Sequence, residues 1–214
     1  MVRTRPKGYE AKKRGSRRRP EKKVLLIAAE GRNKTEKNYF RHFAGGNVNV
    51  CFVRGNETDP VQMARHMIED CRDLDLSERD YAVCLADSDF DPRKDKALQQ
   101  AEKEIQAAQK KVQSPMDLIV SGPCFEIWYI CHFSYTTRQY AKTEDVLREL
   151  EKYIPGYRKG QEDRFLSMLD DKLETAIRNA KKLEQYCQEN HKRAHHVEFM
   201  PSTEVYKVFE KCLR

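Results

Sequence analysis

Carboxylates follow two of the apolar runs in this sequence. Residues 24 to 36 read VLLIAAEGRNKTE, an apolar run that ends at Glu30 and passes directly into polar residues. Residues 81 to 92 read YAVCLADSDFDP, in which a second apolar run ends in Asp87, Asp89 and Asp91. An ionised group at the tip of a buried strand is costly unless a partner neutralises it. These carboxylates are therefore candidates for chemistry.

The position and spacing of these acids predict a metal site. Both apolar runs are short and bounded, as expected of buried strands, and ligands bind outside the carboxyl ends of strands in open parallel sheets. In an extended segment Asp87 and Asp89 would project to the same side, roughly 6.6 Å apart, and face Glu30 if the strands are neighbours. Converging carboxylates repel one another unless a cation neutralises them. Mg²⁺, or Mn²⁺ in its place, would bind here and leave positions for a substrate phosphate. The alternative is an ordinary loop with helix-capping aspartates.

Two further acids have open roles. Asp91 either completes the metal site or caps the helix expected after Pro92. Glu126 lies in the apolar segment CFEIWYICHF, where it is either a carboxylate facing a cleft or a first-turn acid favoured by the helix dipole. A bound metal would lower the pKa of its water and promote phosphodiester hydrolysis. Glu30 would then be a third ligand or the general base, and both roles stay open.

Basic residues near these acids could hold a phosphate backbone. Lys34 could contact the scissile phosphate, or it is an exposed lysine in the first turn of a helix. Arg158 and Lys159, flanked by glycines in GYRKGQ, could wrap a backbone phosphate, with a solvated loop as the default interpretation.

Other residues of chemical interest have structural explanations. Trp128 could stack on bases, but apolar residues at helical spacing more often belong to the core. His132 is similarly expected to be a core histidine rather than a proton donor. Cys187, His191 and His195 would share one helix face, which makes a zinc site conceivable but not expected.

The positive charge is concentrated at the amino terminus. The first 23 residues carry 11 of the 41 basic residues and only two of the 34 acidic ones, which leaves 30 basic and 32 acidic residues in the remainder. Residues 1–21, with Arg17, Arg18 and Arg19, are expected to be a disordered basic arm because they cannot bury enough apolar surface. Such an arm either binds phosphates without sequence preference or only increases solubility.

The cysteine content and the apolar runs of the sequence indicate in which cellular compartment the protein is expected. The seven cysteines are odd in number, scattered and without a C-x-x-C pair, so buried free thiols of a cytoplasmic protein are expected. The sequence contains no apolar run approaching the ~20 residues that span a bilayer, and no export signal is apparent. We therefore expect no membrane partner.

The periodicity predicts an α/β fold. Apolar runs at 24–29, 48–55, 81–87 and 116–122 alternate with helical patterns, which indicates a mostly parallel four-stranded sheet flanked by helices. Helices are then expected at about 143–153, 163–190 and 202–213. We expect residues 22–134 to form the α/β core and residues 135–214 to form a helical extension packed on it.

Four sequence blocks resemble a known family. The pattern of strand-Glu-Gly followed by strand-Asp-x-Asp is similar to the Toprim catalytic fold. More narrowly, AAEGRNKTEKNYF, ADSDFD, SGPCFEIWYICHF and MPSTEVYKVFEKCL resemble, in that order, the blocks of the RloB (AbiLii-like) family. The resemblance covers residues 22 to 213.

This resemblance implies a metal-dependent, Toprim-like nuclease of bacterial anti-phage or restriction-linked loci, often encoded beside an AAA or ABC-type ATPase. Glu30 matches the Toprim glutamate, and Asp87 and Asp89 match the Asp-x-Asp pair. The substrate would be RNA, possibly tRNA by analogy with other anti-phage effectors, or DNA, and a homo-oligomer is possible. The alternative is a non-catalytic nucleic-acid-binding or regulatory subunit of an ATPase complex.

Overall fold

The described part of the chain contains one five-stranded sheet. The computed structural model describes residues 22–30, 35–55 and 57–213, except for the side chain of Asp163. The strands are β1 (Lys23–Ala28), β2 (Val48–Phe52), β3 (Tyr81–Asp87), β4 (Met116–Gly122) and β5 (Ser202–Thr203). Their order is β2-β1-β3-β4-β5. The first four strands are parallel and β5 is antiparallel to β4. The predicted α/β class with a mostly parallel sheet is confirmed, as a Rossmann-like arrangement, but the prediction of four strands missed β5.

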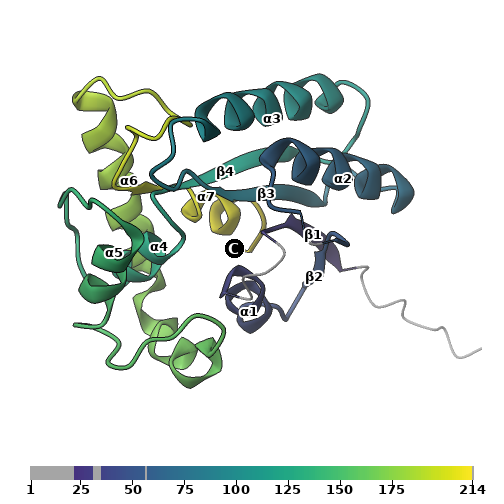
Figure 1. Cartoon of the computed structure of the whole chain (residues 1–214). Coiled ribbons are helices and arrows are strands. Elements are labelled where there is room, and N and C mark those ends of the chain that lie inside the picture. Colours follow the sequence, from purple (N-terminus) through teal and green to yellow (C-terminus); the bar gives the residue numbers. More distant parts are fainter. Residues whose placement is uncertain (1–21, 31–34, 56, 214) are drawn as a thin grey trace, which may run out of the picture.

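Helices cover both faces of this sheet (Figure 1). They are α1 (Thr35–His42), α2 (Pro60–Asp73), α3 (Lys94–Gln109), α4 (Glu126–Cys131), α5 (Thr143–Leu150), α6 (Leu173–Glu189) and α7 (Tyr206–Val208). Figure 1 shows α2 and α3 together above the strands, with α1 below them and α5 and α6 at the left. This two-sided cover is what a parallel sheet requires, because both faces of its strands are apolar.

The alternation of side chains along β1 separates two hydrophobic clusters. Leu26 and Ala28 pack in a cluster with α2 and α3. Leu25 and Ile27 pack in the other cluster, with α1, α4, α5, α6 and α7. Successive residues of a strand point to opposite faces, so the continuous apolar run of β1 supplies both cores.

Helix α2 begins as its sequence predicts. Asp59 has an extended backbone and accepts a hydrogen bond of 3.0 Å from the Gln62 amide, and Pro60 is the first helical residue. This cap satisfies an otherwise unpaired amide. The helix ends at Asp73, and Leu74, which follows it, is 54% exposed.

The segment after residue 134 packs into the same core as the sheet. Helices α5, α6 and α7 contribute to the cluster that contains α1 and α4, and β5 pairs Thr203 with Ser121 of β4. The prediction that a helix begins at Ser202 is therefore wrong, because Ser202 and Thr203 form β5 and α7 begins at Tyr206. The long helix predicted from residue 163 begins only at Leu173, after three short 3₁₀ turns within 162–172.

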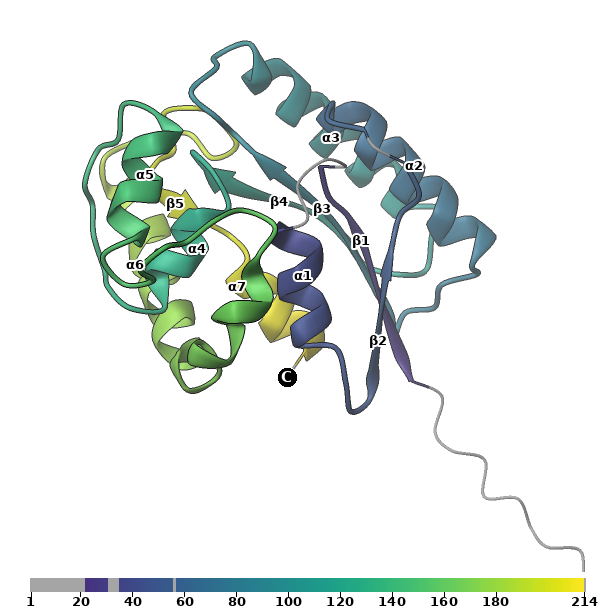
Figure 2. The same cartoon turned by 60° about the horizontal axis from the view of Figure 1, so that its bottom comes forward.

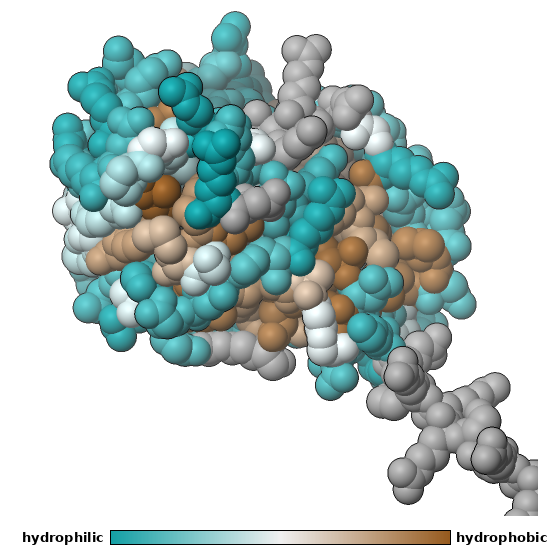
Figure 3. All heavy atoms as spheres, turned by 90° about the horizontal axis from the view of Figure 1, so that it is seen from below, coloured by the Kyte–Doolittle hydropathy of each residue, from teal (hydrophilic) through white to brown (hydrophobic). Residues whose placement is uncertain are grey.

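Apolar surface remains visible on the face that carries α1 (Figure 3), where partly buried side chains such as Phe43, Val48 and Val50 pack at the edge of this cluster. Trp128 is fully buried, which confirms its core interpretation, and its neighbour Tyr129 is fully buried as well. All seven cysteines are free thiols, and six of them are buried. Within the described residues, every helix is too short or too polar to cross a bilayer.

Candidate active site at the carboxyl ends of the strands

The carboxyl ends of β1, β3 and β4 meet at a narrow pocket. Asp87 is the last residue of β3 and lies opposite Ser121 of β4. Glu30 follows β1 by two residues. Both acids line the pocket together with Glu36 from α1. The sequence predicted that Glu30 and Asp87 would lie close together, and in the structure both line this pocket.

Asp87 has the most perturbed electrostatics of these acids. Burial raises the pKa of its carboxyl group well above the usual value, and the charges of Glu36, Glu126 and Glu30 raise it further, in that order. Four carboxyl groups from four segments of the chain thus act on one another. Strongly perturbed carboxyl groups in a pocket are typical of functional sites.

Glu36 is a further residue of the site, and none of the sequence-based predictions assigned it a role. Its side chain is 6% exposed, and its Oε2 atom is buried without a hydrogen-bond partner among the described residues. Burial raises its pKa to about 7, with a further contribution from the charge of Glu126. The sequence holds a partial signal, because the aromatic residues Tyr39 and Phe40, three and four residues later, share its helix face.

A buried carboxylate from the C-terminal segment positions the helix that carries Glu36. Glu162 accepts hydrogen bonds of 2.8 Å each from Thr35 Oγ1, Asn38 Nδ2 and the Gly160 amide. Figure 2 shows the segment after α5 running beside α1. The C-terminal extension therefore fixes the first turn of α1 and, with it, the position of Glu36.

Glu126 is completely buried at the start of α4. Its Oε1 atom lies 2.9 Å from Lys159 Nζ and accepts a hydrogen bond of 3.0 Å from the Tyr157 hydroxyl. Its Oε2 atom is buried and has no partner among the described residues. Burial alone would lower the pKa of Lys159, but the charge and hydrogen bond of Glu126 raise it. Lys159, expected from the sequence to face a phosphate, is thus held at the acidic site, and a third of its side chain remains exposed.

Lys94, at the start of α3, lies between two of the predicted ligands. Its Nζ atom is 3.1 Å from Glu30 Oε1, forms a short ion pair with Asp89, and donates to the Asp87 carbonyl oxygen at 3.3 Å. The predicted extended geometry of Asp87 and Asp89 is wrong, because Asp89 has a φ of 48°. The strand ends at Asp87, and Asp89 turns toward Lys94.

Asp91 lies at the start of the helix that follows it. Its Oδ1 atom accepts hydrogen bonds from the Arg93 amide at 3.0 Å and from Arg93 Nε at 2.9 Å. The hydrogen bonds from Arg93 lower the pKa of Asp91. These contacts hold the turn before α3, but they do not cap the helix, because its cap position is Arg93 and no side-chain hydrogen bond caps it.

The remaining candidates lie elsewhere. His132 is buried, with Nδ1 2.9 Å from the Trp128 carbonyl oxygen, and burial lowers its pKa to about 4. The zinc site considered above would require His191 and His195 to lie on the same helix as Cys187. They do not, because α6 ends at Glu189. Arg158 is exposed. Lys34, Arg17, Arg18, Arg19 and the predicted basic arm lie outside the described residues.

Comparison with protein-family models gives a match to the family described as RloB-like protein over residues 25–212. The chain belongs to the RloB-like family. The match spans the sheet and the C-terminal extension, and therefore all of the acids described above. Comparisons of this RloB-like chain with curated proteins and with solved structures gave no match.

The donor set of this RloB-like site suits a hard cation. Its candidate ligands are carboxylates, and Glu36 and Glu126 each have a buried oxygen atom without a partner in the described part of the chain. Magnesium prefers such oxygen ligands. As they are placed, the described residues contain no group of three Cys, His, Asp or Glu arranged to hold a metal ion. Lys94 and Lys159 supply positive charge to this site instead.

Proposed function

We propose that this protein is a metal-dependent phosphodiesterase, a Toprim-type nuclease that acts on RNA, possibly tRNA, or DNA. One observation supports this most directly. Burial and three neighbouring carboxylates raise the pKa of Asp87 at the carboxyl end of β3, which is where open parallel sheets bind their ligands. A divalent cation would relieve this repulsion, and a substrate phosphate would approach the same edge.

Glu30, Glu36 and Asp87 are the residues that we assign to Mg²⁺ or Mn²⁺, because all three line the same pocket. Asp89 is available as a further ligand if Lys94 releases it. When bound, the metal would lower the pKa of a water molecule and neutralise charge developing on the phosphate. Asp91 is not included, because its carboxylate is bonded to Arg93.

The two lysines have distinct roles in this proposal. Lys94 keeps Glu30 and Asp89 neutralised when no metal is bound. Lys159 stays charged beside Glu126, because that carboxylate raises its pKa. Its partly exposed ammonium group can donate a hydrogen bond to a phosphate oxygen while it remains bonded to Glu126.

The biological setting follows from the family resemblance. A nuclease of this kind would serve in anti-phage defence and would be regulated by an AAA or ABC-type ATPase. The basic segment at residues 1–21, with Arg17, Arg18 and Arg19, would add affinity for the phosphate backbone without sequence preference.

A second function is favoured by one specific observation. The ion pairs of Lys94 with Glu30 and Asp89 already neutralise two of the predicted ligands. If these pairs persist in the presence of metal, the protein would be a non-catalytic nucleic-acid-binding or regulatory subunit of an ATPase complex.

Calorimetric titration of Mg²⁺ and Mn²⁺, run beside cleavage assays on labelled tRNA and DNA pools, separates the two functions. We expect Asp87→Asn to abolish both metal binding and cleavage. Asp91→Asn is the matched control, because it removes an aspartate from the same loop and should retain both activities. Metal-dependent cleavage that survives in Asp87→Asn would refute the assignment, and nucleic-acid binding without cleavage in any metal would support the second function.

A further inference from the structure

The C-terminal extension contains a cavity of about 280 Å³ between residues 154 and 168. Its walls include the aromatic residues Tyr157 and Phe165, two arginines, Arg158 and Arg164, and Met168. This volume is near the lower limit of typical small-molecule sites. The cavity is separate from the acidic pocket, since the two share no lining residue.

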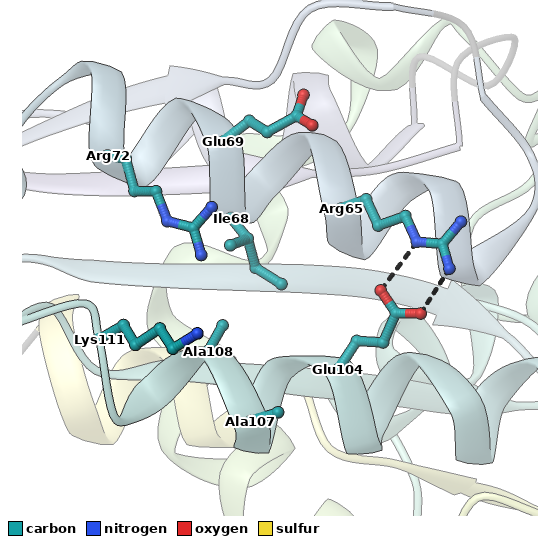
Figure 4. Close-up of a pocket in the computed structure, with 8 residues that line it drawn as sticks. All are labelled: Arg65, Ile68, Glu69, Arg72, Glu104, Ala107, Ala108 and Lys111. Carbon is teal, nitrogen blue, oxygen red and sulfur yellow. Dashed lines mark hydrogen bonds and ion pairs between the residues drawn. The ribbon is translucent and has the colours of Figure 1, made fainter.

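The charge of this cavity is not compensated by its own walls. Its lining includes two arginines and no acidic residue. Within the described part of the chain, the guanidinium groups of Arg158 and Arg164 form no hydrogen bond or ion pair. The cavity between α2 and α3, of about 290 Å³, is the opposite case. There Arg65 donates two hydrogen bonds to Glu104, at 2.8 and 2.7 Å (Figure 4).

The walls also offer aromatic and apolar surface. The rings of Tyr157 and Phe165 are packed edge to face, with centroids 5.5 Å apart, and at 6% and 5% exposure they form the largely buried floor of the cavity. Met168 is 46% exposed, which is unusual for a large apolar side chain in this molecule. Aromatic and apolar surface next to unpaired arginines is the combination that binds single-stranded nucleic acid, because bases stack on rings while guanidinium groups pair with phosphates.

One loop connects this cavity to the acidic site. Tyr157 lines the cavity, and its hydroxyl group donates to Glu126. Lys159, two residues later, forms an ion pair with the same carboxylate. The cavity therefore lies beside the acidic site, within reach of a nucleotide strand that is bound there.

We propose that this cavity binds one nucleotide of a single-stranded nucleic acid, with its base against Met168 and the aromatic floor and its phosphate on Arg158 and Arg164. The proposal rests on the proposed function for the placement of the strand across the acidic site. It identifies single-stranded segments, rather than uniform duplex, as the preferred substrate class.

Photo-crosslinking in EDTA tests this inference without requiring cleavage. The probe is a short single-stranded RNA that contains 4-thiouridine, added to the full-length chain, with crosslinked peptides mapped by mass spectrometry and affinity measured by fluorescence anisotropy. We expect crosslinks within residues 154–168. The double variant Arg158→Ala/Arg164→Ala should lose them and bind the RNA at least about tenfold more weakly.

Two matched controls separate a local site from general charge. Arg65→Ala/Arg72→Ala removes the same charge from the other cavity and should retain the crosslinks and most of the affinity. Met168→Glu should weaken binding by placing a carboxylate beside the arginines, whereas Leu74→Glu alters another exposed apolar side chain, 54% against 46% exposed, and should not. Circular dichroism and thermal melting verify that each variant is folded.

This experiment can reject the nucleotide-binding cavity independently of the nuclease function. Crosslinks that map only outside residues 154–168, or equal losses in both double-arginine variants, would overturn the cavity proposal even if metal-dependent cleavage occurs. Crosslinks within 154–168 that disappear in the Arg158/Arg164 variant would support it even if no metal supports cleavage.

Discussion

Two buried glutamates in this molecule have opposite environments. Glu204, directly after β5, has its Oε2 atom 3.0 Å from His195 Nε2 and 3.0 Å from the Val120 amide, and its Oε1 atom pairs with Lys207. Burial would raise its pKa, but His195 and Lys207 lower it to about 2. Glu36 has an oxygen atom without a partner among the described residues, and its pKa is raised to about 7.

The difference distinguishes a structural acid from a candidate functional one. A buried charge that is fully paired holds its surroundings together, and breaking the pair is strongly destabilising. A buried carboxyl group left short of partners costs stability, and proteins retain such groups mainly where a ligand completes them. Glu204 belongs to the first type, and Glu36, Asp87 and Glu126 belong to the second.

The largest effect is expected for Glu204→Gln. This change removes the buried charge that pairs with both His195 and Lys207, so that His195 keeps only the ion pair with Glu102 and Lys207 only that with Glu184. We expect a loss of about 3 kcal/mol in the free energy of unfolding at pH 7, measured by urea denaturation. If this variant is no less stable than Glu36→Gln at the same pH, the proposed distinction between the two acids is wrong.

Glu36 should make the protein less stable as pH rises. Its folded pKa, about 7, lies above the usual value of 4.5, so the folded state retains a proton that the unfolded state loses. Stability should therefore fall between about pH 4.5 and pH 7, by up to about 3 kcal/mol from this group. Urea denaturation across this range should show a smaller fall for Glu36→Gln. An unchanged pH profile would contradict the unpaired environment of Glu36.

Lys94→Met should strengthen divalent-cation binding. In the wild type a metal must displace Lys94 from Glu30 and Asp89, and removal of the lysine frees both carboxylates. Because this ion pair is only partly buried, we expect a gain of about tenfold or less, on the order of 1 kcal/mol. Calorimetric titration of Mn²⁺ measures it, with Lys96→Met, two residues along the same helix, as the control. Equal affinities in the two variants would show that Lys94 does not compete with the metal.

The smallest effect is expected for His195. Burial alone would lower its pKa, but the hydrogen bond and charge of Glu204, aided by Glu102, raise it. A histidine with a raised folded pKa stabilises the protein fully below the usual pKa of about 6.5, and this contribution is lost as pH rises through the folded value. His195→Gln should remove that fall, on the order of 1 kcal/mol. The loss of stability from His195 begins near the pH at which the loss from Glu36 is complete. Measurements above pH 7 therefore separate the contributions of the two groups.

Features that depend on neighbouring residues were predictable from the sequence. The start of α2 follows from Asp59 and Pro60, because both act on the adjacent turn. The placement of Glu30 and Asp87 at one edge of the sheet follows from the ends of two apolar runs in a parallel fold. The position of Asp89 was not predictable in the same way, since its φ of 48° departs from the extended geometry that the alternation assumes.

Features that depend on distant residues were not predictable. The contact between Lys159 and Glu126 and the bond from Thr35 to Glu162 join the core to the C-terminal segment, the latter across 127 residues of sequence. Strand β5 has only two residues, too few to give a periodic signal. The role of Glu36 was not predicted, because its burial results from the tertiary packing of α1 against this distant segment.

The position of β5 has a consequence for how the protein is made. β4 ends at Gly122, but the strand that pairs with it begins at Ser202, close to the end of the described chain. During synthesis the chain emerges with its amino-terminal end first. The sheet cannot be completed, and Glu204 cannot reach the Val120 amide, until almost all of the described chain has left the ribosome. Arrested nascent chains that stop before residue 202 should therefore remain sensitive to protease.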